Sequence, residues 1–439
     1  MKDISLDIIE KMRSKYLSDP FAQAMANSVS KNGPLPASID FEKQKSLPFS
    51  FSVDVWDEGV TDQGESLRCW AFASLNVVRQ NVKAALGIAE KNFQLSQNYI
   101  YFFDQLEKSS GFLNRIIENI SSPIETPIMQ RLLSRPIMDN GQWSNFIVIA
   151  EKYGVVPKCF MPDTQCSPDT KYITRILEQK LKLSAKQLRD ASSSGKNESE
   201  LYELKERQME GVFSILCRFL GAPPKSFTFE YRKPDGTYIR LDETTPLEFF
   251  EKYGGMKSHD YMMVMHHPSQ KRPFMKCYTC QKSQSHSPET KLNLDMPDIK
   301  TLVIAQLKGG EQVVMGCDVA KQSHKPTGYM HKALLDYENV FGTELEFPDK
   351  ASRILYKATS GTHIMSFSGV ELDKENKPIR WKVQNSYGEG MGIKGHYVMD
   401  DSWFEEYVLS VVINKKYASQ EMLKAYEAEP EYMDQSELY

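Results

Sequence analysis

The sequence from residue 62 to residue 73 reads DQGESLRCWAFA. Cys69 begins a run, CWAFASLNVVRQNVKAAL, that contains no glycine or proline and carries apolar residues at helical spacing. Ser66 is a candidate cap, so we predict a mostly buried helix with Cys69 in its first turn. A free thiol has a pKa of about 8.5, and a helix N-terminus lowers it. This position therefore suits a nucleophilic cysteine.

Three further side chains supply what such a nucleophile needs. His363 can act as a base, Asn385 can fix its tautomer, and Gln63 can donate to an oxyanion together with the Cys69 backbone N–H. Taken singly, the histidine is more often a core residue, the asparagine a turn residue and the glutamine a solvated side chain. Their order along the chain favours the catalytic interpretation. This chemistry requires no metal and no cofactor, and we expect neither.

The C-terminal half reads as β-rich. A helix is predicted at 301–310, and strand-like runs follow, separated by Gly, Asn and Asp. These runs are VVMGCDV (313–319), GTHIMSFSGV (361–370), IRWKVQNSYG (379–388), GHYVMDD (395–401) and EYVLSVVINK (406–415). An early helix with Cys69 and a late β-rich half indicate an α+β fold whose two lobes face each other across a cleft.

The middle of the chain has a different character. Charge-rich helical segments flank the turn ASSSGKNES (191–199), which predicts an exposed helical hairpin. Two alternating runs around Asp235-Gly236 predict a β-hairpin. At the other end of the chain, we predict an N-terminal helix, polar connectors over 28–36, and an extended stretch that reaches a strand at 50–55.

Composition narrows the classes of partner. Net charge is −4 with the basic residues dispersed along the 439-residue chain, so nucleic acid is not an expected partner. We find no apolar run long enough to cross a membrane and no secretory signal at the N-terminus, and we expect a cytoplasmic protein. Seven cysteines, an odd number, argue against a disulfide framework.

Cys277 and Cys280 form a CxxC with His266, His267 and His286 nearby in sequence. Zinc and redox interpretations exist for such a motif. There is no second CxxC, and the motif lies in a strand-like stretch, so we interpret both cysteines as incidental thiols.

Residues 62–73 resemble the nucleophile motif of the papain superfamily, and the form Arg68-Cys69-Trp70 is similar to its aminopeptidase C/bleomycin hydrolase branch. THIM (362–365) and WKVQNSYGE (381–389) resemble the histidine and asparagine motifs of that branch. Similarity extends to GQW (141–143), EKYGVVPK (151–158), GCDV (316–319) and DYE (336–338). Cys69 and His363 are 294 residues apart, against about 130–150 in papain, and a large insertion at this place distinguishes the branch.

The resemblance implies a papain-like two-lobed fold with a large helical insertion. We divide the chain into an N-terminal arm (1–50), a helical lobe (51–166), an inserted helical hairpin plus β-hairpin (167–260), a β-rich lobe (261–420) and a C-terminal arm (421–439). Members of the branch are homohexamers whose C-terminal arm lies in the cleft and receives the free amine of a peptide substrate. The candidate substrate-binding residues are Trp70, Leu67, Ile364, Tyr387 and Tyr439.

The chain departs from the family pattern at several of these positions. Leu67 stands where the family has Gly, and Ile364 where a small Ala is usual. Tyr387 replaces the Trp that screens the Asn–His hydrogen bond. The tail EYMDQSELY (431–439) lacks the usual ending. The predicted function is a cysteine aminopeptidase that removes N-terminal residues from peptides. An oligopeptide endopeptidase of the same fold and a catalytically silent binding or scaffold homologue are the alternatives.

Overall fold

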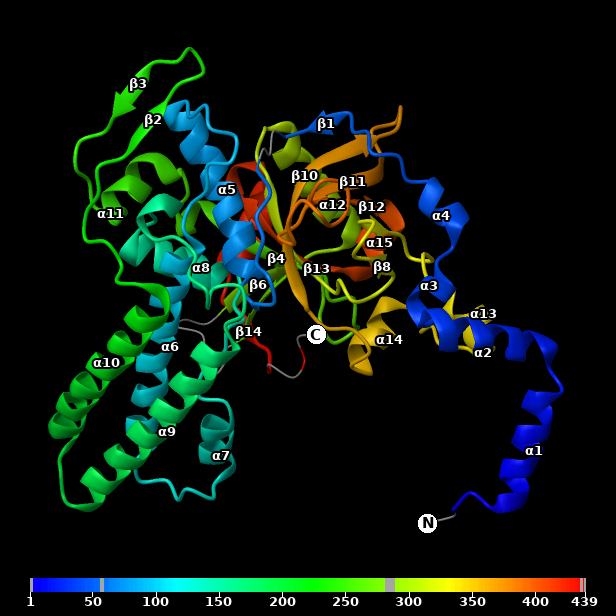
Figure 1. The fold of residues 1–439 in the computed structure, drawn as a ribbon, viewed down its shortest axis with the longest axis horizontal. Helices are drawn as coiled ribbons and strands as arrows, with labels where there is room; N and C mark the ends of the chain where they lie inside the picture. The colour runs from blue at the N-terminus through cyan, green and yellow to red at the C-terminus, as the bar shows by residue number, and fades with distance from the viewer. Residues whose placement is uncertain (1–2, 56–58, 281–288, 435–436, 438–439) are drawn as a thin grey trace.

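The computed structural model of the protein describes residues 3–55, 59–280, 289–434 and 437. A helical lobe and a β-rich lobe lie side by side, and the N-terminal arm extends from the β-rich lobe (Figure 1). The arrangement matches the two lobes predicted from the sequence, while the predicted domain boundaries remain a prediction.

The helical lobe is built around the predicted cysteine helix, α5 (Cys69–Leu86), which is buried along most of its length. It packs against α6 (Gln97–Glu118), α8 (Trp143–Tyr153) and strand β10 (His363–Leu372) of the other lobe. The helix ends at Gly87, whose φ of 64° is a left-handed conformation that glycine adopts without steric cost. A short helix, α7 (Pro127–Ser134), follows α6.

The predicted insertion elements are confirmed. Helices α9 (Lys171–Ser193) and α10 (Glu198–Leu220) form the hairpin and pack on α6. Asn197 and Glu200 form a capping box that begins α10. Strands β2 (Glu230–Arg232) and β3 (Tyr238–Arg240) form the β-hairpin, and α11 (Pro246–Phe249) follows it.

One sheet organises the β-rich lobe. Its strand order is β14-β5-β6-β4-β13-β7-β10-β11-β12-β9-β8, and β1 pairs with β10. The strands are β1 (Val53–Asp54), β4 (Tyr261–Met265), β5 (Lys276–Cys280), β6 (Glu289–Asn293), β7 (Val313–Cys317), β8 (Ser323–His324), β9 (Tyr329–Met330), β10 (His363–Leu372), β11 (Pro378–Gln384), β12 (His396–Asp400), β13 (Val408–Asn414) and β14 (Glu431–Tyr432). All five strand-like runs predicted in the C-terminal half are therefore strands.

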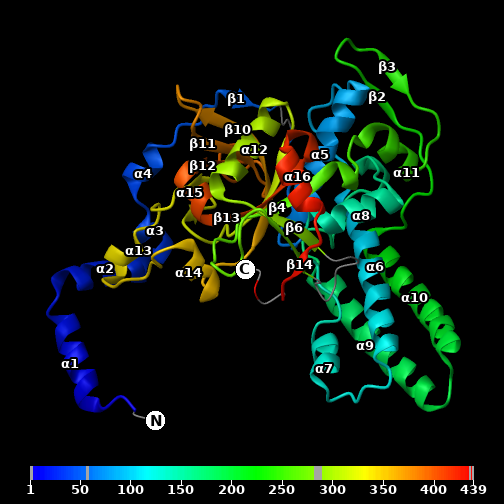
Figure 2. The same cartoon turned by 180° about the vertical axis from the view of Figure 1, so that it is seen from behind.

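Helices α12 (Met296–Lys308), α15 (Asp401–Tyr407) and α16 (Gln420–Glu427) pack on this sheet and contribute to its core. Helix α13 (Tyr337–Phe341) contacts the N-terminal arm, and α14 (Lys350–Leu355) is joined to β13 by a hydrogen bond from Lys350 to the Val408 carbonyl oxygen. Seen from behind, α12 and α16 cover one face of the sheet (Figure 2), where α12 contacts β13 and α16 contacts β5.

The N-terminal arm differs from the prediction. Residues 28–36 were expected to be polar connectors, and 37–50 extended. Instead the arm contains α1 (Leu6–Leu17), α2 (Pro20–Asn32), α3 (Pro34–Ser38) and α4 (Phe41–Lys45). The Asp19 side chain caps α2, and partly buried residues at positions 22, 25, 26 and 29 give it a helical contact face against α13. This helical spacing is the feature of the sequence that predicts α2, and the expectation of polar connectors did not take it into account.

Within the part of the chain that the structure describes, no helix combines the length and apolar character needed to cross a membrane.

Candidate active site

Cys69 is the first residue of α5, as predicted, and its side chain is half-buried. Burial raises the pKa of the Cys69 thiol, and the backbone N–H groups of Ile364, Trp70 and Cys69, which face its sulfur, partly offset that rise. Ser66 does not cap the helix, because Arg68 occupies the cap position. The Ser66 hydroxyl instead donates to the Gln63 carbonyl oxygen (2.6 Å). The first-turn prediction is confirmed and the capping prediction is wrong.

Arg68 is a site residue to which the sequence analysis assigned no role. Its buried guanidinium donates to Asn98 Oδ1 of α6 (2.9 Å) and to the Ser167 carbonyl oxygen (2.5 Å). It also lies over the Tyr101 ring, 5.2 Å from the centroid. Arg68 thereby fixes the start of α5 to α6 and to the loop before α9.

The loop before α5 is paired with the loop that carries Asn385. Gln63 N–H donates to the Ser386 carbonyl oxygen (2.9 Å), and Gly388 N–H donates to that of Thr61 (3.1 Å). Gly64 has a φ of 60°, and a Cβ there would lie 2.6 Å from the Pro168 carbonyl oxygen. The chain can make this close approach only with glycine.

The Gln63 side chain is buried and held at both ends of its amide. Nε2 donates to the Ser66 carbonyl oxygen (2.6 Å), and Oε1 accepts from the Ser386 hydroxyl (2.6 Å). A primary amide nitrogen carries two hydrogens, so one N–H remains to donate to another oxygen.

His363 begins β10 and is paired with Cys317 of β7. Its Nε2–H donates to Asn385 Oδ1 (2.9 Å), which also accepts from the Ser386 backbone N–H (2.8 Å). Two donors on one oxygen fix the orientation of the amide, and the Nε2 tautomer leaves Nδ1 of His363 as an acceptor. Since Ile364 N–H faces the Cys69 sulfur, the two lobes bring Cys69 beside the His363–Asn385 pair.

Burial dominates the electrostatics of this pair. It raises the pKa of Cys69 to about 11 and lowers that of His363 to about 4. Both shifts favour a neutral thiol beside a neutral imidazole. The hydrogen bond to Asn385 opposes the shift of His363, and the backbone N–H groups oppose that of Cys69.

The five candidate substrate-binding residues differ in their position and exposure. Trp70 is fully buried and donates from Nε1 to the Asp139 carbonyl oxygen (3.0 Å), so it belongs to the core and does not face substrate. Leu67 is 60% exposed, and Ile364 is half-buried beside the Cys69 sulfur. Tyr387 stacks on His363 with ring centroids 5.0 Å apart. Tyr439 lies outside the described residues.

Two more residues around His363 received no role from the sequence, although one of them, Asp318, lies in the family-like stretch GCDV (316–319). Asp318 is buried and accepts from Thr359 Oγ1 (2.7 Å) and Ser360 N–H (3.1 Å), which holds the loop before His363. Lys325 lies over the Tyr387 ring. Each of these contacts joins residues from different segments of the chain, so a local motif cannot predict it.

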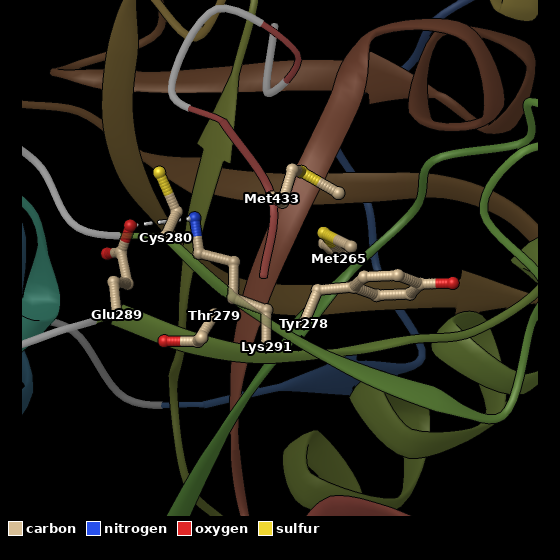
Figure 3. A pocket seen from close by; sticks show the side chains of 7 residues that line it. All are labelled: Met265, Tyr278, Thr279, Cys280, Glu289, Lys291 and Met433. Atoms are coloured by element: carbon tan, nitrogen blue, oxygen red, sulfur yellow. Dashed lines mark ion pairs between the residues drawn. The ribbon is translucent and has the colours of Figure 1, made fainter. Parts of the chain in front are cut away.

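The C-terminal arm is attached to the β-rich lobe. Strand β14 pairs in parallel with β5, and the fully buried Met433 packs against Met265, Tyr278 and Cys280 (Figure 3). Further along, Arg272 forms an ion pair with the Glu437 carboxylate, and His267 Nε2 lies 3.1 Å from the Glu437 carbonyl oxygen.

Cys277 and Cys280 lie on β5, as predicted, and both are buried. His286 lies outside the described residues. Among the residues that the structure places, no group of three or more His, Cys, Asp or Glu is arranged to hold a metal ion.

A model of the Peptidase C1-like family matches residues 3–436, so the chain belongs to this family. Aminopeptidase C of Streptococcus thermophilus is 35% identical over 99% of this chain and 97% of its own length. Aminopeptidase C of Listeria innocua is 35% identical over 98% of this chain and 96% of its own. The crystal structure of PepW from Lactobacillus rhamnosis HN001 superimposes with a TM-score of 0.93 at 32% identity, covering 98% of this chain and 97% of that one. The resemblance and the papain-like α+β fold predicted from the sequence are confirmed.

Proposed function

We propose that the protein is a cysteine aminopeptidase that releases N-terminal residues from peptides, with Cys69 as nucleophile, His363 as base, Asn385 as orienting residue and Gln63 as oxyanion donor. One observation carries this proposal: the His363–Asn385 hydrogen bond lies beside a cysteine at the start of a helix. The relatives named Aminopeptidase C support the exopeptidase assignment.

The reaction is an acyl transfer. Cys69 gives its proton to His363 Nδ1, and the thiolate attacks the peptide carbonyl carbon. The Cys69 backbone N–H and the remaining Gln63 N–H stabilise the oxyanion. His363 then protonates the leaving amine as the C–N bond breaks. In the second half, His363 takes a proton from water, whose oxygen attacks the thioester and restores the thiol. No metal or cofactor takes part in these steps.

The experiment is cleavage of one peptide in two forms, free and N-acetylated, by the wild-type protein and a Cys69→Ala control. Cysteine-dependent cleavage of the free form alone supports the aminopeptidase. Equal cleavage of both forms, or internal cleavage, favours the endopeptidase instead, which the unusual tail makes the second candidate. If neither form is cleaved and Cys69 reacts with a peptide-based thiol reagent no faster than free cysteine does, the proposal is wrong.

The proposal includes a homohexamer in the cytoplasm. None of the residues of α1 is buried, although the helix carries large apolar side chains. Leu6 is 82% exposed and Met12 is 60% exposed, and contact with a second copy of the chain would bury these apolar side chains. All seven cysteines are free thiols, which suits a reducing compartment.

A further inference from the structure

A lysine contacts the aromatic ring that stacks on His363. The rings of Tyr387 and His363 are 5.0 Å apart between centroids and inclined by only 7°. Nζ of Lys325 lies 3.7 Å from the centroid of the same Tyr387 ring. An ammonium group at this distance is attracted to the electron-rich face of the ring. Lys325 is therefore coupled to the imidazole through one aromatic side chain.

The backbone at Lys325 is held by the active site itself. Lys325 lies in the turn between β8 and β9, which a contact between His324 Nδ1 and Thr327 Oγ1 (2.7 Å) closes. Its carbonyl oxygen accepts from the Tyr397 hydroxyl (3.1 Å). Tyr397 also interacts with the side chain of Asn385. The backbone of Lys325 is thus held in place, and its side chain, although exposed, has its ammonium group on the Tyr387 ring.

Among the residues that the structure describes, Lys325 is the cation that acts on the His363 ring. The other titratable side chains that act on the Tyr387 and His363 rings come from elements packed around them: Cys69 of α5, Glu65 of the preceding loop, Cys317 of β7 and Tyr397 of β12. At neutral pH none of these four carries a positive charge.

We propose that Lys325 is a positioning residue of this active site whose charge, held on the Tyr387 ring, sets the pH range in which the Cys69–His363 pair works. A nearby positive charge favours the deprotonated form of any acid, so it lowers the pKa of a thiol and of an imidazolium alike. Burial lowers the pKa of His363 most, the hydrogen bond to Asn385 opposes it, and Lys325 adds a smaller lowering in the same direction as burial. The inference rests on the proposed function, which gives Cys69 and His363 their roles.

The test uses Lys325→Met, which removes the charge and keeps a side chain of similar length. Lys325→Arg keeps the charge, and Lys321→Met removes an exposed lysine four residues away. The rate of Cys69 alkylation by iodoacetamide is followed over about pH 4 to 10 by mass spectrometry of the Cys69 peptide in the full-length protein. This reaction requires a reactive thiol but no peptide hydrolysis.

We expect the Lys325→Met profile to shift to higher pH by about 0.5 unit, because a cation several ångströms away contributes a fraction of a kcal/mol in water-like surroundings. The Lys325→Arg and Lys321→Met profiles should match the wild type. The shift should shrink in about 1 M salt, since the Debye length is then about 3 Å.

Coincident profiles for the wild type and Lys325→Met would overturn the inference, as would an equal shift in Lys321→Met, which would indicate a general charge effect. If Cys69 of the wild type reacts like free cysteine at every pH, the proposed function itself fails and the inference falls with it. The two failures are therefore distinguishable.

Discussion

Gln63 is held at both ends of its amide, and this explains how a flexible side chain can act as a fixed donor. Ser66 and Ser386 hold its nitrogen and its oxygen. We expect Gln63→Ala to lower kcat about 100-fold, because an oxyanion donor acts mainly in the transition state. Steady-state kinetics on an aminoacyl substrate with a free amine would measure the loss, and KM should change by less than kcat.

Ser386→Ala provides the matched control for Gln63→Ala. It removes the hydroxyl that donates to Gln63 Oε1 and leaves the amide N–H groups in place. We expect a smaller loss of kcat than in Gln63→Ala. A Gln63→Ala enzyme with wild-type kcat would contradict the role of this residue as an oxyanion donor.

The sequence predicted the residues of the proposed reaction because their motifs are local and ordered along the chain. The prediction that Trp70 binds substrate was wrong, because two residues that are neighbours in sequence do not lie on the same face of a helix. Successive side chains differ by about 100° around the axis, so the residue after the nucleophile points into the core. The roles of Arg68, Asp318 and Lys325 were not predicted, although the first two lie in family-like motifs, because their partners are distant in sequence and no spacing rule connects them.

At the scale of elements, α5 depends on the fit of Trp70 against the chain segment at Gly141. A Cβ on Gly141 would lie 2.7 Å from two atoms of the Trp70 ring. We expect Gly141→Ala to lower the free energy of unfolding by about 1–3 kcal/mol through overpacking, and to reduce activity because Trp70 follows Cys69. Urea denaturation and peptide cleavage would measure the two effects.

Gly390→Ala is the control for Gly141→Ala, because a Cβ at Gly390 meets nothing within 4 Å. Its unfolding free energy should stay within about 0.5 kcal/mol of the wild type. If both alanine variants are equally stable, the contact with Trp70 does not constrain the helix.

Elements with strong periodicity were predictable and their pairing was not. The α9–α10 hairpin follows from two helical repeats and a polar turn. By contrast, β13 lies between β4 and β7, which are far from it in sequence. Such an order depends on packing across the whole lobe, where local propensity carries no information. The same holds for α2, whose weak contact face has meaning only beside α13.

For the whole molecule, the exposed apolar face of α1 leads to a prediction about assembly. We expect the wild-type chain to form a hexamer and the double variant Ile9→Glu/Met12→Glu to dissociate, because two carboxylates would be buried at a subunit contact. Analytical ultracentrifugation would measure the mass. Ser14→Glu adds a charge to the same helix at an exposed polar position and should assemble normally. A wild-type monomer would contradict the proposed hexamer.

The last prediction concerns the C-terminal arm and whether it restricts cleavage to peptides with a free N-terminal amine. Met433 is buried in the β-rich lobe and Arg272 binds Glu437, so the arm is held near its end at two separate points. If the terminal carboxylate receives the substrate's free amine, deletion of residues 436–439 should lower kcat/KM for a free-amine peptide at least about 10-fold, the equivalent of about 1.4 kcal/mol of lost binding in the transition state. Cleavage of the N-acetylated peptide should rise relative to it.

Two variants distinguish the effect of the terminal carboxylate from the effect of the rest of the arm. Tyr439→Ala keeps a terminal carboxylate at the same chain length and should retain the preference for a free amine. Arg272→Met removes the cation that pairs with both Glu431 and Glu437, so it should loosen the arm and weaken the preference in the direction of the deletion. An unchanged ratio of free to acetylated cleavage in the deletion variant would show that the arm does not select the amine. The exopeptidase preference would then have to arise from residues of the cleft, of which the exposed Leu67 is the first to test.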